Sequence, residues 1–214
     1  MTRFGRRCIA ARKAECSFDL IGFFVQNDTI NDMERAQNQR MTVDEFLAWA
    51  ETQDGRYELH GGEVFSMAAE RTIHAEVKFA IQSALQAGIR RAGLPCFMLP
   101  DGMTVRISDD TAHEPDALVY CGPKLPPNAI EVPNPVIVVE VLSPSTRRID
   151  ASKKLAGYFS LPSLHHYLIV DPDKPPLIHH QRQGDGTILT RLISDGVVRL
   201  DPPGLDFQVS ALFG

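Results

Sequence analysis

Residues 135–143 of this chain read PVIVVEVLS, a run that is apolar and β-branched almost throughout. Such a run is typical of a central strand that is buried on both faces of a sheet. The exception within it is Glu140. An ionised carboxylate in an apolar interior costs on the order of several kcal/mol unless a cation or hydrogen bonds compensate it. The sequence therefore predicts a central strand in which Glu140 has a partner.

Helices and further strands are predicted on both sides of this strand. Apolar residues recur at four-residue steps from Ile73 to Ile89, which places them on one face of a long helix. Two shorter helices are predicted, one opened by a capping box of Thr42 and Glu45 and one over residues 146–162. A hairpin is predicted over residues 57–67, and further strands over residues 95–100, 103–108, 116–120, 165–171, 176–182, 187–193 and 196–200. We therefore predict an α/β fold of the mixed α+β kind, with a central mixed β-sheet flanked by helices and a β-rich C-terminal part.

Composition excludes several classes of protein. The chain has 214 residues, of which 43% are hydrophobic and 23% charged, and this balance suits a globular domain rather than a disordered chain. A net charge of −5 excludes a broadly basic protein that coats nucleic acid. No run approaches the roughly 20 apolar residues of a membrane helix, so we expect no membrane partner. The four cysteines form no C-x-x-C pair and no signal peptide is evident, which favours a cytoplasmic protein with reduced thiols.

The first forty residues differ from the rest of the chain. They carry seven basic and five acidic residues, a net charge of +2 that leaves −7 for the remainder. Their opening resembles a targeting peptide, but the apolar stretch at 17–25 is short and interrupted by Asp19. A mistaken upstream start is the plainer interpretation, because the capping box after Met41 is a natural beginning. We predict an N-terminal extension over residues 1–40, mis-started or flexible, and one domain over residues 41–214.

Asp116 is the obvious second acidic residue, because it follows Pro115 and begins a predicted strand. Two adjacent short strands would bring Asp116 and Glu140 to one edge of the sheet. Their combined charge would favour a hard divalent cation, which takes oxygen ligands. The alternative is a structural ion pair for Glu140 and a turn or strand cap for Asp116. These two positions alone leave both interpretations open.

Four motifs together resemble a known family. They are PDALV at 115–119, VVEVLSPSTRR at 138–148, D-x-x-x-K-L-x-x-Y at 150–158 and HYLIVDP at 166–172. The chain resembles the Uma-type branch of restriction endonucleases, within the PD-(D/E)XK nuclease superfamily, from near Met41 to about Val170. The resemblance implies a restriction-endonuclease-like core of αβββαβ order, which agrees with the elements predicted above, and a metal-dependent phosphodiesterase activity.

The resemblance also implies roles for individual residues. Asp116 and Glu140 match the two acidic metal ligands of the superfamily. Glu58, in YELHGGE, matches a further acidic position that binds metal directly or through water. The superfamily pattern has a lysine two residues after the second acid, but this chain has Leu142 there. Lys154, in the following helix, matches the branch's own K-L-x-x-Y pattern and is the expected catalytic cation.

Several of these and neighbouring residues have a structural interpretation beside the functional one. Glu58 could be the exposed side of a hairpin. Lys153 is either an accessory cation or part of a solvated helix face. Arg147 and Arg148 either bind phosphate or are ordinary surface arginines. His74, near the start of the long helix, either assists catalysis or makes a structural hydrogen bond.

The resulting hypothesis is a Mg²⁺- or Mn²⁺-dependent endonuclease, a hydrolase of phosphodiester bonds with DNA as its expected partner. The ion would position a water and stabilise the leaving 3′ oxygen, and Lys154 would add positive charge in the transition state. Cutting both strands would require two active sites, so we expect a homodimer. Two alternatives stay open: a nuclease-fold binding or interaction protein without catalysis, which Leu142 favours, and a metal-dependent hydrolase of RNA. No motif distinguishes DNA from RNA.

Overall fold

Six strands form the main sheet, in the order β10-β9-β8-β7-β6-β3. β7 (Pro135–Val141) lies inside it, parallel to β8 (His166–Val170) and antiparallel to β6 (Ala117–Cys121). Every residue of β7 except Val136 is buried, so the predicted central strand and mixed sheet are confirmed. The other strands of this sheet are β3 (Cys96–Pro100), β9 (Leu177–Arg182) and β10 (Ile188–Ile193). The structure, a computed structural model, describes residues 40–67, 69–142, 151–174 and 176–213.

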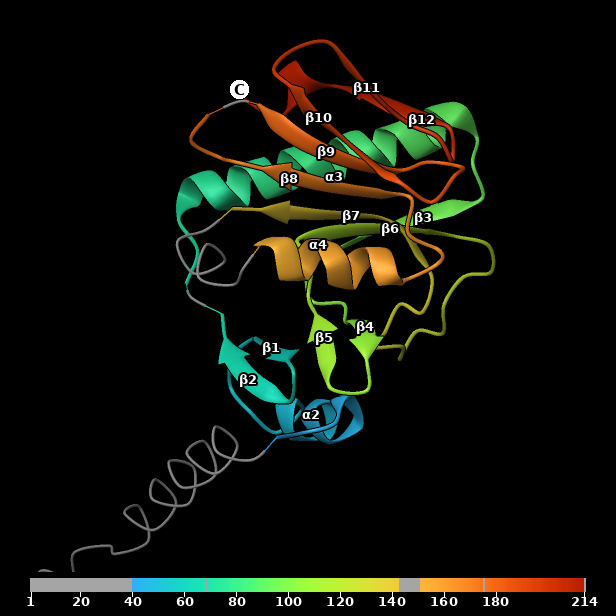
Figure 1. Cartoon of the computed structure of the whole chain (residues 1–214). Coiled ribbons are helices and arrows are strands. Elements are labelled where there is room, and N and C mark those ends of the chain that lie inside the picture. The colour runs from blue at the N-terminus through green and yellow to red at the C-terminus, as the bar shows by residue number, and fades with distance from the viewer. Residues whose placement is uncertain (1–39, 68, 143–150, 175, 214) are drawn as a thin grey trace, which may run out of the picture. The chain divides into compact units, whose positions relative to one another are not determined.

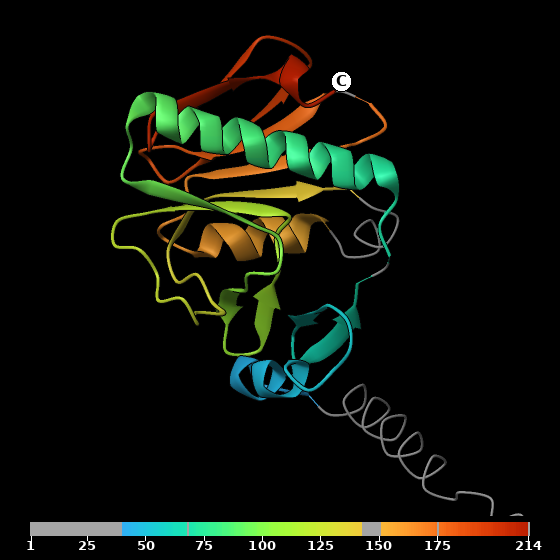
Figure 2. The same cartoon turned by 180° about the vertical axis from the view of Figure 1, so that it is seen from behind.

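Figures 1 and 2 show two helices on opposite faces of this sheet, α3 (Thr72–Ala92) and α4 (Ala151–Ser160). The predicted apolar stripe of α3 faces the sheet, where Ile81 and Leu85 are fully buried. Gly93 ends this helix with a left-handed backbone conformation, for which glycine is the usual residue. The long helix and its end are therefore confirmed.

Alternation along β7 divides its side chains between these two helices. Successive residues of a strand point to opposite faces of the sheet. Ile137 and Val139 belong to the core cluster that contains the stripe of α3, whereas Val138 belongs to the cluster on the side of α4. Glu140 and Leu142 are two and four residues after Val138, so they also face the side of α4. This register decides which helix supplies partners to Glu140.

A second sheet of four strands, in the order β2-β1-β5-β4, packs with the short helix α2 (Val43–Ala50). The capping box of Thr42 and Glu45 is present at the start of α2, as predicted. The predicted hairpin joins β1 to β2 through Gly61 and Gly62, both with positive φ. The strands of this sheet are β1 (Tyr57–His60), β2 (Glu63–Ser66), β4 (Val105–Ser108) and β5 (Thr111–His113).

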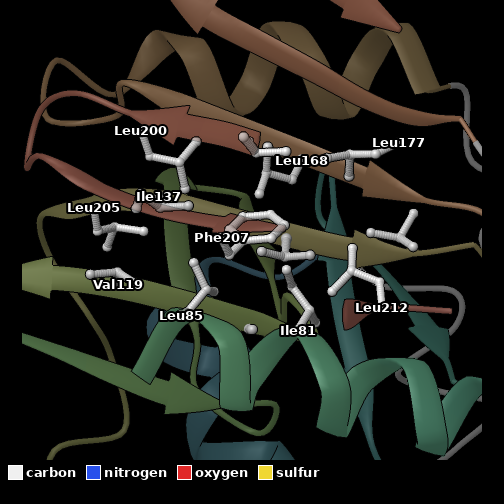
Figure 3. Packing of buried hydrophobic residues seen from close by; sticks show 14 of the residues in the cluster. Ile81, Leu85, Val119, Ile137, Leu168, Leu177, Leu200, Leu205, Phe207 and Leu212 are labelled. Atoms are coloured by element: carbon white, nitrogen blue, oxygen red, sulfur yellow. The ribbon is translucent and has the colours of Figure 1, made fainter. Parts of the chain in front are cut away.

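The β-rich C-terminal part covers α3. Of the elements in this part, β9 and β10 belong to the main sheet, whereas β11 (Val197–Leu200), β12 (Leu205–Gln208) and the 3-10 helix η2 (Val209–Ala211) follow them in the chain and form the cover. Figure 3 shows Phe207 of β12 within the same apolar cluster as Leu85 of α3. A Cβ atom on Gly88 of α3 would lie 3.0 Å from the carbonyl oxygen of Asp206, so the absence of a side chain permits this close approach.

One expectation about the cysteines is wrong. Cys96 in β3 and Cys121 in β6 face each other in register and form a disulfide, whereas the sequence favoured reduced thiols. The two residues are 25 positions apart, so a search for C-x-x-C spacing does not find the pair. No helix among the described residues is long and apolar enough to cross a membrane. The predicted extension over residues 1–40 lies, apart from Arg40, outside the described residues.

Candidate active site

The buried carboxylate of Glu140 has the partner that its strand requires. Lys154 of α4 donates a hydrogen bond from Nζ to Oε1 of Glu140 at 2.9 Å. Tyr158, one turn further along α4, donates from its hydroxyl to the same oxygen at 2.7 Å. Residues four apart on a helix lie on one face, which explains how α4 presents both groups together. All three side chains are buried.

Glu58 joins this group from the second sheet. The ammonium of Lys154 donates a second hydrogen bond, to Oε1 of Glu58 at 2.9 Å. The same oxygen accepts from the backbone N–H of Glu114 at 3.0 Å, and Oε2 lies 3.1 Å from Nε2 of His60. Glu58 is only 3% exposed, so the exposed-hairpin interpretation of this residue is wrong. One lysine thus links carboxylates from β1 and β7.

Asp116 lies against β7 beside Glu140. Its backbone N–H donates to the carbonyl oxygen of Val139 at 3.0 Å. Its side chain accepts from the backbone N–H of Val141 at 2.6 Å through Oδ2. These two bonds engage the residues on either side of Glu140. Asp116 thus lies immediately before β6, opposite Glu140 on the neighbouring strand β7.

A second lysine, Lys78 of α3, holds the other oxygen of Asp116. Its ammonium lies 3.1 Å from Oδ1 of Asp116 and 2.5 Å from Oδ2 of Asp101, and it also contacts Glu70. Arg56 extends the cluster, with NH1 2.6 Å from Oδ2 of Asp101. No pattern in the sequence indicated this lysine, because its carboxylate partners come from separate segments of the chain.

Negative charge exceeds positive charge around these contacts. In the part of the chain that the structure describes, six carboxylates share the cations of Arg56, Lys78 and Lys154. The six carboxylates belong to Glu58, Glu70, Asp101, Glu114, Asp116 and Glu140. Three of these carboxylates, those of Glu58, Asp116 and Glu140, are buried. An excess of carboxylate oxygens suits a hard divalent cation, because such ions take oxygen ligands and supply the missing positive charge. Acidic residues suited to a divalent cation are therefore present.

The electrostatics of the three central acids differ. Burial and the neighbouring carboxylates of Glu58 and Asp116 outweigh Lys154 and raise the pKa of Glu140 to about 7. Burial also raises the pKa of Asp116, although Lys78 and the N–H of Val141 act against it. At Glu58 burial is outweighed by Lys154 and His60, so its pKa is lowered. Glu58 is therefore the acid that stays ionised most easily.

His113, at the end of β5, is a buried neutral base beside these acids. Burial and the charge of Lys154 lower the pKa of His113 to about 3. Its ring lies 4.6 Å from that of His60 and 5.1 Å from that of Tyr158, measured between centroids. Its Nδ1 is buried and has no hydrogen-bond partner among the residues described. Neither His113 nor His60 was singled out from the sequence, since each stands alone in its segment.

The remaining predicted residues are placed as follows. Lys153 is exposed, unlike its buried neighbour Lys154. His74 of α3 is buried and lies with Nε2 2.7 Å from the carbonyl oxygen of Leu142, a contact that anchors the end of β7 to the helix. Arg147 and Arg148 lie outside the described residues.

Two groups of side chains in the described ranges have ligand atoms within 4.8 Å of one another. One consists of Glu58, His60 and His113, and the other of Glu70, Asp101 and Asp116. Glu140 belongs to neither group, and its Oε1 contacts Lys154 and Tyr158.

The chain matches the model of the Uma2 family, described as "Putative restriction endonuclease", over residues 43–212. Two proteins of Synechocystis sp. (strain ATCC 27184 / PCC 6803 / Kazusa), the uncharacterized proteins slr1290 and sll1609, are each 27% identical to it. Those alignments cover 81% and 75% of this chain and 92% of each relative.

A solved structure is also similar. It is the crystal structure of a "putative nuclease belonging to DUF820" from Anabaena variabilis ATCC 29413, with a TM-score of 0.62 and 16% sequence identity. The likeness covers 81% of this chain and 97% of that chain. At this identity the likeness shows a shared nuclease fold.

Proposed function

This chain belongs to the Uma2 family, and on that premise we propose that it is a divalent-metal-dependent endonuclease that hydrolyses phosphodiester bonds of DNA. The observation that carries the proposal is the buried contact of Lys154 with both Glu58 and Glu140. An ammonium held between acids of two sheets is costly to bury and serves no core packing. Such clusters of shifted ionisable groups are typical of catalytic sites.

Asp116, Glu140 and Glu58 are the residues that would hold the ion, which we propose to be Mg²⁺ or Mn²⁺. When bound, such an ion polarises the phosphate and lowers the pKa of a bound water. Hydrogen bonds from other groups of the chain orient two of these acids. The N–H of Val141 orients Asp116 from β7, while the hydroxyl of Tyr158 orients Glu140 from α4. Both acids are thereby fixed before substrate binds.

Lys154 takes the role of the cation that the superfamily pattern places at Leu142. Leu142 is apolar and packs against the core on the side of α4, so it cannot supply positive charge to a phosphate. The ammonium of Lys154 is 2.9 Å from Glu140 and can turn toward the charge that develops on a transferring phosphoryl group. The displaced lysine, which favoured a non-catalytic protein on sequence alone, has a replacement in the fold. This placement supports an active enzyme over an inactive binding protein.

Cleavage measured across substrate forms tests this function. Supercoiled plasmid, linear duplex, single-stranded DNA and RNA would each be incubated with Mg²⁺, with Mn²⁺, and with a chelator. We expect DNA cleavage that requires the metal and is absent in Asp116→Asn. Cleavage of RNA alone would reassign the polymer, and metal binding without any cleavage would contradict an enzyme. Equal nicking and double-strand cutting rates across protein concentrations would argue against the homodimer that we propose for duplex cutting.

A further inference from the structure

Two histidines, His60 and His113, lie beside Glu58 and have no role in the nuclease mechanism proposed above. His60 is two residues after Glu58 in β1, so both side chains stand on one face of that strand. In the antiparallel pair of β1 and β5, Leu59 faces Ala112, which sets His113 opposite Glu58. The pairing of these two strands, and not a sequence motif, brings the three side chains together.

The three residues present ligand atoms to one another. A carboxylate oxygen of Glu58 and one ring nitrogen of each histidine all lie within 4.8 Å of one another. Nε2 of His60 is 3.1 Å from Oε2 of Glu58, and the two imidazole rings are 4.6 Å apart between centroids. A metal ion bound by these three atoms would lie about 2.0–2.2 Å from each of them.

An independent observation concerns His113. Its side chain is 2% exposed, and its buried Nδ1 has no hydrogen-bond partner among the described residues. A buried polar atom without a partner is rare in folded proteins and calls for an explanation. His166 pairs through both ring nitrogens, to His179 and to the carbonyl oxygen of Pro202, whereas the buried Nδ1 of His74 lacks a partner in the described residues as that of His113 does. His113 differs from His166 in this respect.

We propose that Glu58, His60 and His113 bind a divalent transition-metal ion, with Zn²⁺ the preferred occupant and Co²⁺ a spectroscopic substitute. Two imidazoles with one carboxylate form a donor set that suits Zn²⁺ and its neighbours, whereas Mg²⁺ takes oxygen ligands. Three protein ligands leave a further coordination position for water, which is the pattern of an open metal site. Glu58 is common to this site and to the ion proposed at Asp116 and Glu140, whereas His60 and His113 belong to this site alone. Occupancy of this site does not require cleavage activity.

The surroundings tolerate a dication at this place. Lys154 contacts Oε1 of Glu58, while Oε2 is the oxygen beside His60, so the two oxygens serve different partners. Lys154 pairs with both Glu58 and Glu140. The net charge of Glu58, Glu140 and Lys154 together is therefore −1 when both acids are ionised.

A Co²⁺ titration of the metal-free full chain, followed by visible absorption, tests the site. We expect bands typical of a four- or five-coordinate ion with nitrogen ligands, which Zn²⁺ abolishes at equimolar amounts and millimolar Mg²⁺ leaves in place. His60→Gln should weaken Co²⁺ binding by more than about 100-fold, because loss of even an outer partner of a metal ligand costs about 10–100-fold. His60 is half-buried, so this variant tests the site even if His113→Gln fails to fold.

Two further variants separate this site from the nuclease centre. His165→Gln, a matched change at a half-buried histidine just before β8, should bind Co²⁺ as the parent does. Asp116→Asn should keep the bands, since Asp116 belongs to a different group of ligands. Absence of the bands in the parent, equal binding by His60→Gln, or loss of the bands in Asp116→Asn would each overturn the proposal. A failure to cleave DNA bears only on the proposed function.

Discussion

The ammonium of Lys154 lies 2.9 Å from Oε1 of Glu140, although the lysine is on α4 and the acid is on β7. Val138, Glu140 and Leu142 share one face of the strand, and α4 covers that face. A lysine at position 142 of the strand, as in the superfamily pattern, and Lys154 on the covering helix would therefore reach the same space.

Lys154→Met should lower the turnover of DNA cleavage by about 10²–10³, because a preorganised charge in the transition state contributes roughly 3–4 kcal/mol. Lys153→Met is the matched control, since its side chain is exposed on the same helix. Adjacent helix residues point about 100° apart, so Lys153→Met should cleave nearly as the parent does. Affinity for Mn²⁺ should stay or rise in Lys154→Met. Cleavage by Lys154→Met at the parent's rate would remove this lysine from the mechanism.

Asp116→Asn should greatly weaken the binding of Mn²⁺ measured by calorimetry. The variant keeps an oxygen that accepts from the N–H of Val141 but loses the negative charge that attracts the ion. In the absence of metal its melting temperature should stay or rise, because one of several crowded carboxylates is neutralised. Equal Mn²⁺ affinity in the parent and in Asp116→Asn would show that the ion binds elsewhere.

Glu140→Gln should stabilise the metal-free protein at high pH. Because the folded pKa of Glu140 is raised to about 7 from 4.5, ionising this group opposes folding, and the penalty grows as pH rises from about 4.5 to 7. Removing it should increase the free energy of unfolding by up to about 3 kcal/mol at pH 8 and by little near pH 4. Urea unfolding across this pH range with a chelator present measures the difference. Glu76→Gln, on the exposed face of α3, controls for the change of charge.

Lys78→Met should raise the affinity for Mn²⁺ and destabilise the fold. Its ammonium lies 3.1 Å from Oδ1 of Asp116, where it competes with a metal ion for that oxygen. Removing one partner of a buried ion pair costs about 3–5 kcal/mol, and the lower end applies because Asp101 and Glu70 are partly exposed. Calorimetry and thermal melts give the two readouts. Arg90→Met, at an exposed position of α3, should change neither.

A chain that begins at Met41 should fold and melt as the full chain does. The shift in charge at residue 40 and the capping box of α2 motivate this expectation. Circular dichroism during heating, together with the cleavage assay, compares the two chains. Loss of soluble expression or of activity in the shorter chain would show that residues 1–40 contribute to the domain.

Local chemistry in the sequence was enough to predict most elements and two of the acids. The β-branched run of β7, the apolar stripe of α3 and the capping box of α2 each depend on neighbours within a few residues, and all three are present. Glu140 was identifiable because a carboxylate inside an apolar strand is costly to bury without a partner. The motif around Lys154 selected that lysine over Lys153, and burial separates the two in the same way.

Only the tertiary structure determines which residues of the site contact one another. Lys78 contacts Asp101 and Asp116, His113 lies beside Glu58, and Cys96 pairs with Cys121, in each case across separate elements. Such contacts arise from strand register and from the side of a sheet that a helix covers, and these depend on the packing of the whole core. A sequence pattern depends on the neighbours of a residue along the chain. The residues that complete this site are far apart in the sequence, so no local pattern connects them.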